Sequence, residues 1–405
     1  MAKIDDSVKK KVPELRFPGF TDDWEERKLG ELTTSFSGGT PSAGNSSYYK
    51  GDIPFIRSGE INSDKTELFL TEAGLKSSSA KMVSVGDILY ALYGATSGEV
   101  GISQINGAIN QAILAIKPCD GYNSHFLMQW LKLKKQKIID QYLQGGQGNL
   151  SGSIVKNLVL KVPNFEEQKK IGAFFKQLDD TITLHQRKLD LLKEQKKGFL
   201  QKMFPKNGAK VPELRFAGFA DDWEERKLAE FTTSFSGGTP SAGNSSYYKG
   251  DIPFIRSGEI NSDKTELFLT EDGLKNSSAK MVSVGDILYA LYGATSGEVG
   301  ISQINGAINQ AILAIRPIGG YSSHFIMQWL RLQKQKIIDK YLQGGQGNLS
   351  GSIVKNLILN VPNFEEQQRI GSFFKQLDDT IALHQRKLDL LKEQKKGFLQ
   401  TMFAK

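Results

Sequence analysis

Polar side chains that can read DNA bases gather in three stretches of the chain, each beside a short apolar run. These stretches span residues 37–50, 57–62 and 93–111. Arginine can bond O6 and N7 of guanine, asparagine or glutamine can pair with adenine, and glutamate can accept from the amino group of cytosine. Lysines, hydroxyls and exposed glycine amides suit phosphates. On a duplicated and basic chain, the stretches together predict a DNA-reading surface, although an ordinary polar loop is the simpler interpretation of any single residue.

A further glycine-rich stretch, GGQGNLSGS at residues 145–153, can let the backbone approach a phosphate or can make a tight turn. Every candidate residue recurs 199 positions later with the same type. The candidate DNA-binding residues of the first copy are Ser37, Gly38, Gly39, Thr40, Tyr48, Tyr49, Lys50, Arg57, Ser58, Glu60, Asn62, Lys65, Tyr93, Thr96, Ser97, Asn106, Asn110, Gln111, Gln147, Asn149 and Ser151. Those of the second copy are Ser236, Gly237, Gly238, Thr239, Tyr247, Tyr248, Lys249, Arg256, Ser257, Glu259, Asn261, Lys264, Tyr292, Thr295, Ser296, Asn305, Asn309, Gln310, Gln346, Asn348 and Ser350.

The residue types that usually carry catalysis form no recognisable set. The glycine-rich segment 94–101 lacks the Gly-Lys-Ser/Thr ending of a phosphate-binding loop, and no Cys/His spacing resembles a zinc site. The four histidines are two positions and their copies. Asp179 and Asp180 are expected on a solvated helix face, and a nuclease built on them is the weakest alternative. We therefore expect no catalytic residue, no metal and no cofactor in this chain.

Short strands and one helix are expected to position the polar stretches. Apolar runs at residues 53–56, 88–93, 112–116 and 158–162 predict strands. Ser124 is expected to cap an amphipathic helix that ends near Tyr142. Strands, glycine loops and a helix together predict an α+β globular part.

A long segment with a heptad pattern, residues 164–204, follows the globular part and recurs at 363–403. Its apolar positions alternate in steps of four and three, which indicates two helices wound together. Asn164 is expected to cap the helix while Glu167 bonds back to its amide. The expected partner is the other copy, in antiparallel orientation. The seam positions are Leu178, Ile182, His185, Leu189, Leu192, Lys196, Phe199 and Met203, then Leu377, Ile381, His384, Leu388, Leu391, Lys395, Phe398 and Met402.

The chain is a duplication. Residues 12–204 and 211–403 align at a constant offset of 199, with about nine positions in ten identical. This period is too long for a solenoid repeat. We expect an α+β, pseudo-two-fold molecule in which two duplicated domains are separated by two long helices forming an antiparallel coiled coil. The predicted parts are a first domain at 1–163, a central spacer helix at 164–204, a hinge at 205–210, a second domain at 211–362 and a distal spacer helix at 363–405.

Composition limits the class of protein. The net charge is +8 with a pI of about 9.1, which is compatible with a nucleic-acid partner. The single cysteine, Cys119, excludes an intramolecular disulfide framework and fits a reducing compartment. No apolar run reaches transmembrane length, and the first residues do not resemble a signal peptide. We expect a cytoplasmic protein without a membrane partner.

Three segments of the sequence resemble the DNA specificity subunit of type I restriction–modification systems. They are PELRFPGFTDDWEERKLGEL, SGGTPS followed by YYKGDIPFIRSGEI, and GGQGNLSGSIVKNLVLKVPNFEEQKKIGAFFKQLDDTI. The most specific motif is P-x-x-E-E-Q-x-x-I, carried by Pro163, Glu166, Glu167, Gln168 and Ile171. The match covers nearly the whole chain, twice, in the family's order of target recognition domain, helix, recognition domain and helix.

The resemblance implies a non-catalytic subunit that binds double-stranded DNA and directs two methyltransferase subunits, with restriction subunits joined to them, to a split site. S-adenosylmethionine, ATP and Mg²⁺ would then bind the partners. Such subunits commonly carry two different recognition domains, whereas Arg57 and Glu60 here equal Arg256 and Glu259. Equal domains related by a near two-fold axis predict a palindromic target. The alternative is a stand-alone architectural DNA binder or a reader attached to a type II enzyme.

Overall fold

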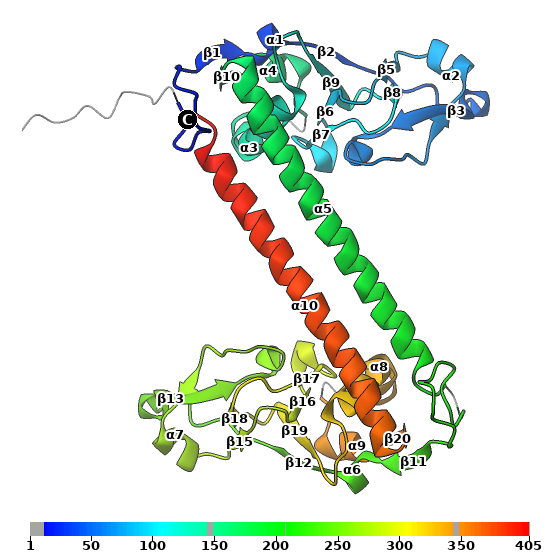
Figure 1. Cartoon of the computed structure of the whole chain (residues 1–405), viewed down its shortest axis with the longest axis vertical. Helices are drawn as coiled ribbons and strands as arrows, with labels where there is room; N and C mark the ends of the chain where they lie inside the picture. The colour runs from blue at the N-terminus through cyan, green and yellow to red at the C-terminus, as the bar shows by residue number, and fades with distance from the viewer. Residues whose placement is uncertain (1–11, 144–148, 207, 343–347, 405) are drawn as a thin grey trace, which may run out of the picture. The chain divides into compact units, whose positions relative to one another are not determined.

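The structure is a computed structural model that describes residues 12–143, 149–206, 208–342 and 348–404 (Figure 1). Its contacts define two compact units. The first unit takes its described residues from 1–186 and 386–405, and the second comprises 187–385. Each unit thus combines one globular part with segments of both long helices. The functional domain limits predicted from the sequence stay a prediction.

The same order of elements occurs in both copies. The first copy contains β1 (Glu25–Lys28), α1 (Leu29–Leu32), β2 (Thr33–Ser37), η1 (Ser46–Tyr48), β3 (Tyr49–Ile56), η2 (Ser58–Glu60), β4 (Phe69–Leu70), α2 (Glu72–Lys76), β5 (Lys81–Val83), β6 (Ile88–Ala91), η3 (Gly94–Thr96), β7 (Val100–Ile102), β8 (Gly107–Ile109), β9 (Ile113–Pro118), α3 (Ser124–Tyr142), α4 (Gly152–Lys156), β10 (Val159–Val162) and α5 (Phe165–Lys202). The second contains β11 (Glu224–Lys227), α6 (Leu228–Phe231), β12 (Thr232–Ser236), η4 (Ser245–Tyr247), β13 (Tyr248–Ile255), η5 (Ser257–Glu259), β14 (Phe268–Leu269), α7 (Glu271–Lys275), β15 (Lys280–Val282), β16 (Ile287–Ala290), η6 (Gly293–Thr295), β17 (Val299–Ile301), β18 (Gly306–Ile308), β19 (Ile312–Pro317), α8 (Ser323–Tyr341), α9 (Gly351–Lys355), β20 (Ile358–Val361) and α10 (Phe364–Thr401).

In the described part of the first unit the strands form two four-stranded sheets and one two-stranded ribbon. The sheet orders are β2-β9-β6-β7 and β4-β3-β8-β5, and the ribbon is β1-β10. Neighbouring strands are antiparallel except β3 and β8, which run parallel. The second unit repeats the pattern as β12-β19-β16-β17, β14-β13-β18-β15 and β11-β20. The predicted α+β class is confirmed.

Strands β6 and β9 are buried on both faces, which explains their unbroken apolar sequences. Ile88 and Tyr90 of β6 belong to the core that includes α3. Leu89 and Ala91 belong instead to a second core shared with Ile56 of β3. The sheet β2-β9-β6-β7 therefore lies between helices on one side and the other sheet on the opposite side.

The helix expected after Ser124 is present as α3, but its cap lies one residue earlier. The Oδ1 atom of Asn123 accepts a hydrogen bond from the amide of Phe126 at 3.0 Å, and Asn123 itself has extended backbone angles. A capping side chain must reach an amide two or three residues further on while its own backbone is still non-helical. Asn123 meets both conditions, so the prediction of Ser124 as the cap is wrong.

The start of α5 confirms half of the predicted capping box. The Oδ1 atom of Asn164 accepts from the amide of Glu167 at 3.0 Å. The Glu167 carboxylate does not serve as the second half of the box; it binds the guanidinium of Arg16, at 2.7 Å from Nε and 2.8 Å from Nη2. A bidentate charged pair is stronger than a bond to a neutral amide, which accounts for the difference. Arg215 and Glu366 repeat the pair in the second unit.

Within the first unit, the N-terminal part of α5 packs against the C-terminal part of α10 (Figure 1). The rings of Phe174 and Phe398 meet edge to face at 5.1 Å, and Asp179 pairs with Lys395. Residue numbers rise along one helix as they fall along the other, so these segments are antiparallel, as predicted. The seam positions are buried or half-buried, whereas the off-seam Leu184 is 66% exposed.

The end of α10 enters the core of the first unit. The ring of Phe403 lies 5.1 Å from Phe126, 6.0 Å from Phe175 and 6.4 Å from Trp24. The amide of Leu15 also donates to the carbonyl of Thr401. The last residues of the second copy therefore complete the globular part formed by the first.

The second unit shows the reciprocal arrangement by itself. The ring of Phe204, just past the end of α5, stacks on Phe325 at 5.3 Å. Lys196 of α5 pairs with Asp378 of α10. Asn207, in the predicted hinge at 205–210, lies outside the described residues. These helix contacts of the two units are thus equivalent, as the duplication predicts.

Candidate nucleic-acid interface

Three of the predicted polar stretches meet at one end of the sheet β2-β9-β6-β7. The register pairs Ser37 at the end of β2 with Leu114, and Ala91 at the end of β6 with Ile113. Because both strands are antiparallel to β9, their C-terminal ends lie beside its N-terminal end. We call the residues that emerge there, together with the loop that joins them at 149–151, the polar rim. Its predicted members are Ser37, Gly38, Gly39, Thr40, Tyr93, Thr96, Ser97, Asn110, Gln111, Asn149 and Ser151.

Hydrogen bonds hold the segments of the polar rim together. The Thr40 hydroxyl donates to Oε1 of Gln111 at 2.7 Å, and the amide of Gly38 donates to the carbonyl of Asn110 at 3.3 Å. Tyr93 and Asn149 form an isolated antiparallel bridge. Stretches that lie up to about a hundred residues apart in the sequence therefore share one surface.

Two glycines of the polar rim have a packing reason for their type. A Cβ on Gly38 would lie 1.8 Å from the carbonyl oxygen of Ile109, and one on Gly39 would lie 2.7 Å from the Cβ of Ser79. No side chain fits at either position, so the loop can pass the β8 and β5 region only with glycine there. A phosphate contact by these glycines stays a prediction.

Other members of the polar rim use their side chains locally. The Oδ1 atom of Asn110 accepts from the amide of Ala112, and the hydroxyl of Ser151 caps α4 by accepting from Ile154. Ser97 is buried and donates to the carbonyl of Leu92. Thr96 donates to the carbonyl of Tyr93. These bonds shape the loops, and any direct DNA contact by these side chains stays a prediction.

Arg57 lies next to the polar rim because β3 and β8 are parallel. Ile56 pairs with Ile109, so Arg57 and Asn110 follow neighbouring strand ends. The Nη2 atom of Arg57 lies 2.8 Å from Glu60 and 3.1 Å from Glu67. The Arg57 side chain is nevertheless 43% exposed. Carboxylates thus take Nε and both hydrogens of Nη2, which orients the side chain and leaves Nη1 for a further partner. Base contact by Arg57 stays a prediction.

The Glu60 carboxylate accepts more hydrogen bonds within the protein than the sequence suggests. Its carboxylate accepts from the Arg57 guanidinium and amide, from the Thr66 hydroxyl and from the amide of Glu67. Burial by itself would raise the pKa of Glu60, but these hydrogen bonds outweigh it and lower the pKa to about 2. Contact of Glu60 with cytosine would have to break this network.

The pKa of Glu60 leads to a prediction about stability. Because the folded pKa of about 2 is below the ordinary 4.5, the ionised carboxylate stabilises the fold above about pH 4.5. That contribution is lost as the pH falls from about 4.5 towards 2. The difference in melting temperature between the wild type and Glu60→Gln should therefore be constant above about pH 5 and shrink below it.

Thermal unfolding followed by circular dichroism from pH 3 to 7 measures this difference. Glu67→Gln is the matched control because its side chain is 86% exposed, and it should change the melting temperature little at any pH. A Glu60→Gln difference that does not depend on pH would contradict the argument.

The remaining candidates lie away from the polar rim. Tyr48 ends η1, and Tyr49 and Lys50 begin β3, opposite the end that Arg57 follows. Lys50 has a positive φ of 64°, beside a register shift in β3. Asn106 precedes β8 and accepts from the amide of Val85, so it is at the other end of that strand from Asn110.

Ser58 lies in η2, whereas Asn62 and Lys65 follow it. A Cβ on Gly101 of β7 would lie 2.4 Å from Oδ1 of Asn62, so Asn62 packs on this edge strand. In the second unit the counterpart Asn261 accepts from Arg331 of α8 at 3.1 Å. The predicted Gln147 and Gln346 lie outside the described residues. The other candidates of the second copy repeat these placements.

Sequence reasoning missed a polar network that joins α3 to the paired helices. The Oδ2 atom of Asp179 accepts from the buried Gln129 of α3 at 2.7 Å, while Oδ1 binds Lys395. The same contacts link Gln328 to Asp378. The expectation that Asp179 lies on a solvated face is wrong, because it bridges two elements. A lysine on an otherwise apolar seam was the signal that could have found it.

Among the described residues, no group of three or more His, Cys, Asp or Glu side chains could hold a metal ion. No helix in that part of the chain is both long and apolar enough to cross a membrane. Cys119 is exposed and unpaired with another cysteine.

The comparison with known proteins identifies the family. The type I restriction modification DNA specificity domain matches residues 21–194 and 220–393, which together make up most of the chain. The chain therefore belongs to this family. The repeat found in the sequence corresponds to the two matches, one for each copy.

Individual relatives agree with this assignment. The MjaVIII specificity subunit of a type I restriction enzyme from Methanocaldococcus jannaschii is 22% identical over 98% of this chain and 95% of its own length. The MjaIX specificity subunit of the same organism is 23% identical over 94% and 92%. The crystal structure of a type I restriction–modification S subunit from M. genitalium has a TM-score of 0.72 at 15% identity, covering 97% of this chain and 99% of that one. That structural likeness shows the shared fold.

Proposed function

We propose that this chain is the non-catalytic DNA-recognition subunit of a type I restriction–modification complex. The polar rim is the observation that carries the proposal. The chain belongs to the DNA specificity family, and each of its two units has this rim with the same residue types. Arg57 beside the rim is exposed and held in one orientation, as direct base readout requires. The basic net charge of +8 supports attraction to the phosphate backbone.

The partners follow from this role. Two methyltransferase subunits would bind the chain, and restriction subunits would join them. S-adenosylmethionine would bind the methyltransferase subunits, and ATP and Mg²⁺ the restriction subunits. The chain itself would supply sequence choice and hold no cofactor, and the complex would act in the cytoplasm.

The target is a bipartite palindrome under this proposal. All candidate residues are identical in the two copies, so each unit should read the same word. A near two-fold relation between equal domains, which the duplication predicts, would reverse the reading direction of the second word. The site would consist of a short word, a gap of unspecified bases and the reverse complement of the word.

Methylome mapping tests the function. The chain would be co-expressed with the methyltransferase encoded beside it, purified as a complex, and methylated bases would be mapped across the host genome. Methylation of a split palindrome that disappears without this chain is the expected result. Methylation at an asymmetric split site would contradict the palindrome but support the function. If the chain bound DNA by itself and did not bind the methyltransferase, an architectural or type II-associated reader would be favoured.

Base contact by Arg57 gives a further prediction. Arg57→Ala together with Arg256→Ala should lower discrimination against wrong sites by about 1–3 kcal/mol per lost bidentate contact. Competition binding to target and mismatched duplexes by the assembled complex would measure it. Glu67→Ala with Glu266→Ala is the control, because it removes an exposed carboxylate while Arg57 keeps its bonds to Glu60. Equal discrimination in both double variants would assign Arg57 a structural role only.

A further inference from the structure

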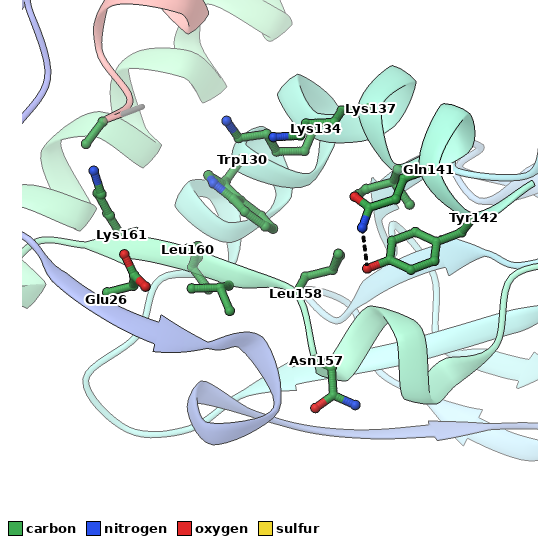
Figure 2. A pocket seen from close by; sticks show the side chains of 13 residues that line it. Glu26, Trp130, Lys134, Lys137, Gln141, Tyr142, Asn157, Leu158, Leu160 and Lys161 are labelled. Atoms are coloured by element: carbon green, nitrogen blue, oxygen red, sulfur yellow. Dashed lines mark hydrogen bonds between the residues drawn. The ribbon is translucent and has the colours of Figure 1, made fainter. Parts of the chain in front are cut away.

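A hollow of about 580 Å³ opens on the first unit among α3, β10 and β1 (Figure 2). Its lining includes Trp130 and Ile138 of α3 and Leu160 of β10, which are 4%, 3% and 2% exposed. Val159 at the same hollow is 50% exposed. None of its described lining residues belongs to the polar rim. The hollow therefore has an apolar floor and no assigned role.

Three lysines surround this floor. Lys134 and Lys137 come from α3 and Lys161 from β10 (Figure 2). Burial lowers the pKa of Lys134, and the charges of Lys137 and Lys161 lower it further. Among the described residues, none forms an ion pair with Lys134 or Lys137. Glu26 is the one carboxylate in the described part of the lining, so these residues carry an excess of positive charge.

We propose that this hollow binds an acidic peptide segment of a protein partner. Carboxylates of the segment meet Lys134 and Lys137, and an apolar side chain of the segment covers the exposed Val159 and the half-buried Leu158. A DNA backbone would satisfy the lysines but leave the exposed Val159 in water. An occupant that combines carboxylates with an apolar side chain matches both properties of the site. The inference does not depend on the proposed function.

The second copy differs at this place although the candidate DNA-binding residues are the same. Gln333 replaces Lys134 and Asn360 replaces Lys161. In the second unit Asn360 donates to the carbonyl of Ala209 at 3.3 Å. The chain therefore provides matched replacements that fit this fold.

The test uses a fluorescein-labelled synthetic peptide with acidic residues on both sides of a Leu-Phe pair, titrated with the full-length chain and followed by anisotropy. The variant Lys134→Gln with Lys161→Asn should bind it about tenfold more weakly, because charge-assisted contacts are lost. The control variant Lys169→Gln with Lys202→Thr also takes two residues from the other copy and removes two charges, but outside the hollow. It should bind like the wild type.

A second peptide separates the apolar contribution. Replacing its Leu-Phe pair with Ser-Ser should weaken binding to the wild type to a similar extent, because Val159 would stay uncovered. The proposal would be overturned if the variant Lys134→Gln with Lys161→Asn bound the original peptide as tightly as the control variant does. The proposal would also be overturned if the variant Lys134→Gln with Lys161→Asn lost as much affinity for a short duplex DNA as for the peptide, because the lysines would then bind phosphates.

Discussion

Phe403→Ala should lower the free energy of unfolding of the first unit by about 3–5 kcal/mol, the range for removing a buried aromatic side chain. Phe403 is 2% exposed and lies among Trp24, Phe126 and Phe175. The neighbours belong to the globular part and to α5, so collapse of the cavity would require several elements to move. The last residues of the chain are thus expected to stabilise a domain built from its beginning.

Urea denaturation followed by tryptophan fluorescence would measure this loss. Phe204→Ala should weaken the second unit to the same extent, since Phe204 contacts Trp223, Phe325 and Phe374 in the equivalent way. Phe69→Ala is the control, because Phe69 is 37% exposed and little apolar burial is lost. If Phe403→Ala cost no more than Phe69→Ala, the end of α10 would not be part of this core.

Arg16→Met should lower the stability of the first unit by about 3–5 kcal/mol, because it leaves the carboxylate of Glu167 buried without its charged partner. The Glu167 side chain is 0% exposed and that of Arg16 is 13% exposed. Arg16 also donates to the carbonyl of Asp22 at 2.7 Å. The loss should come mainly from the uncompensated charge and not from the missing contact itself.

Two variants distinguish these causes in the same denaturation experiment. Arg27→Met removes a surface arginine that is 40% exposed and paired with Glu31, and it should cost about 0–1 kcal/mol. Adding Glu167→Met to Arg16→Met should recover much of the loss, because both charges are then removed together. A double variant as unstable as Arg16→Met would place the effect in packing.

The sequence determined the features that depend on local patterns and on repetition. The heptad steps from Leu178 to Met203 predicted a paired helix, and the apolar runs predicted buried strands, since side-chain period follows backbone geometry. The constant offset of 199 predicted two equivalent units. The cap at Asn164 was also predictable, because its partner lies only three residues away.

Only the tertiary structure decided which distant residues are partners. Glu167 binds Arg16, 151 positions away, and Asp179 binds Lys395, 216 positions away. Local periodicity shows which face of an element is buried but not which element covers it, so neither pair could be predicted. The same holds for the polar rim and for Phe403: strand register brings the loops together, and antiparallel helix pairing brings the end of one copy into the core of the other.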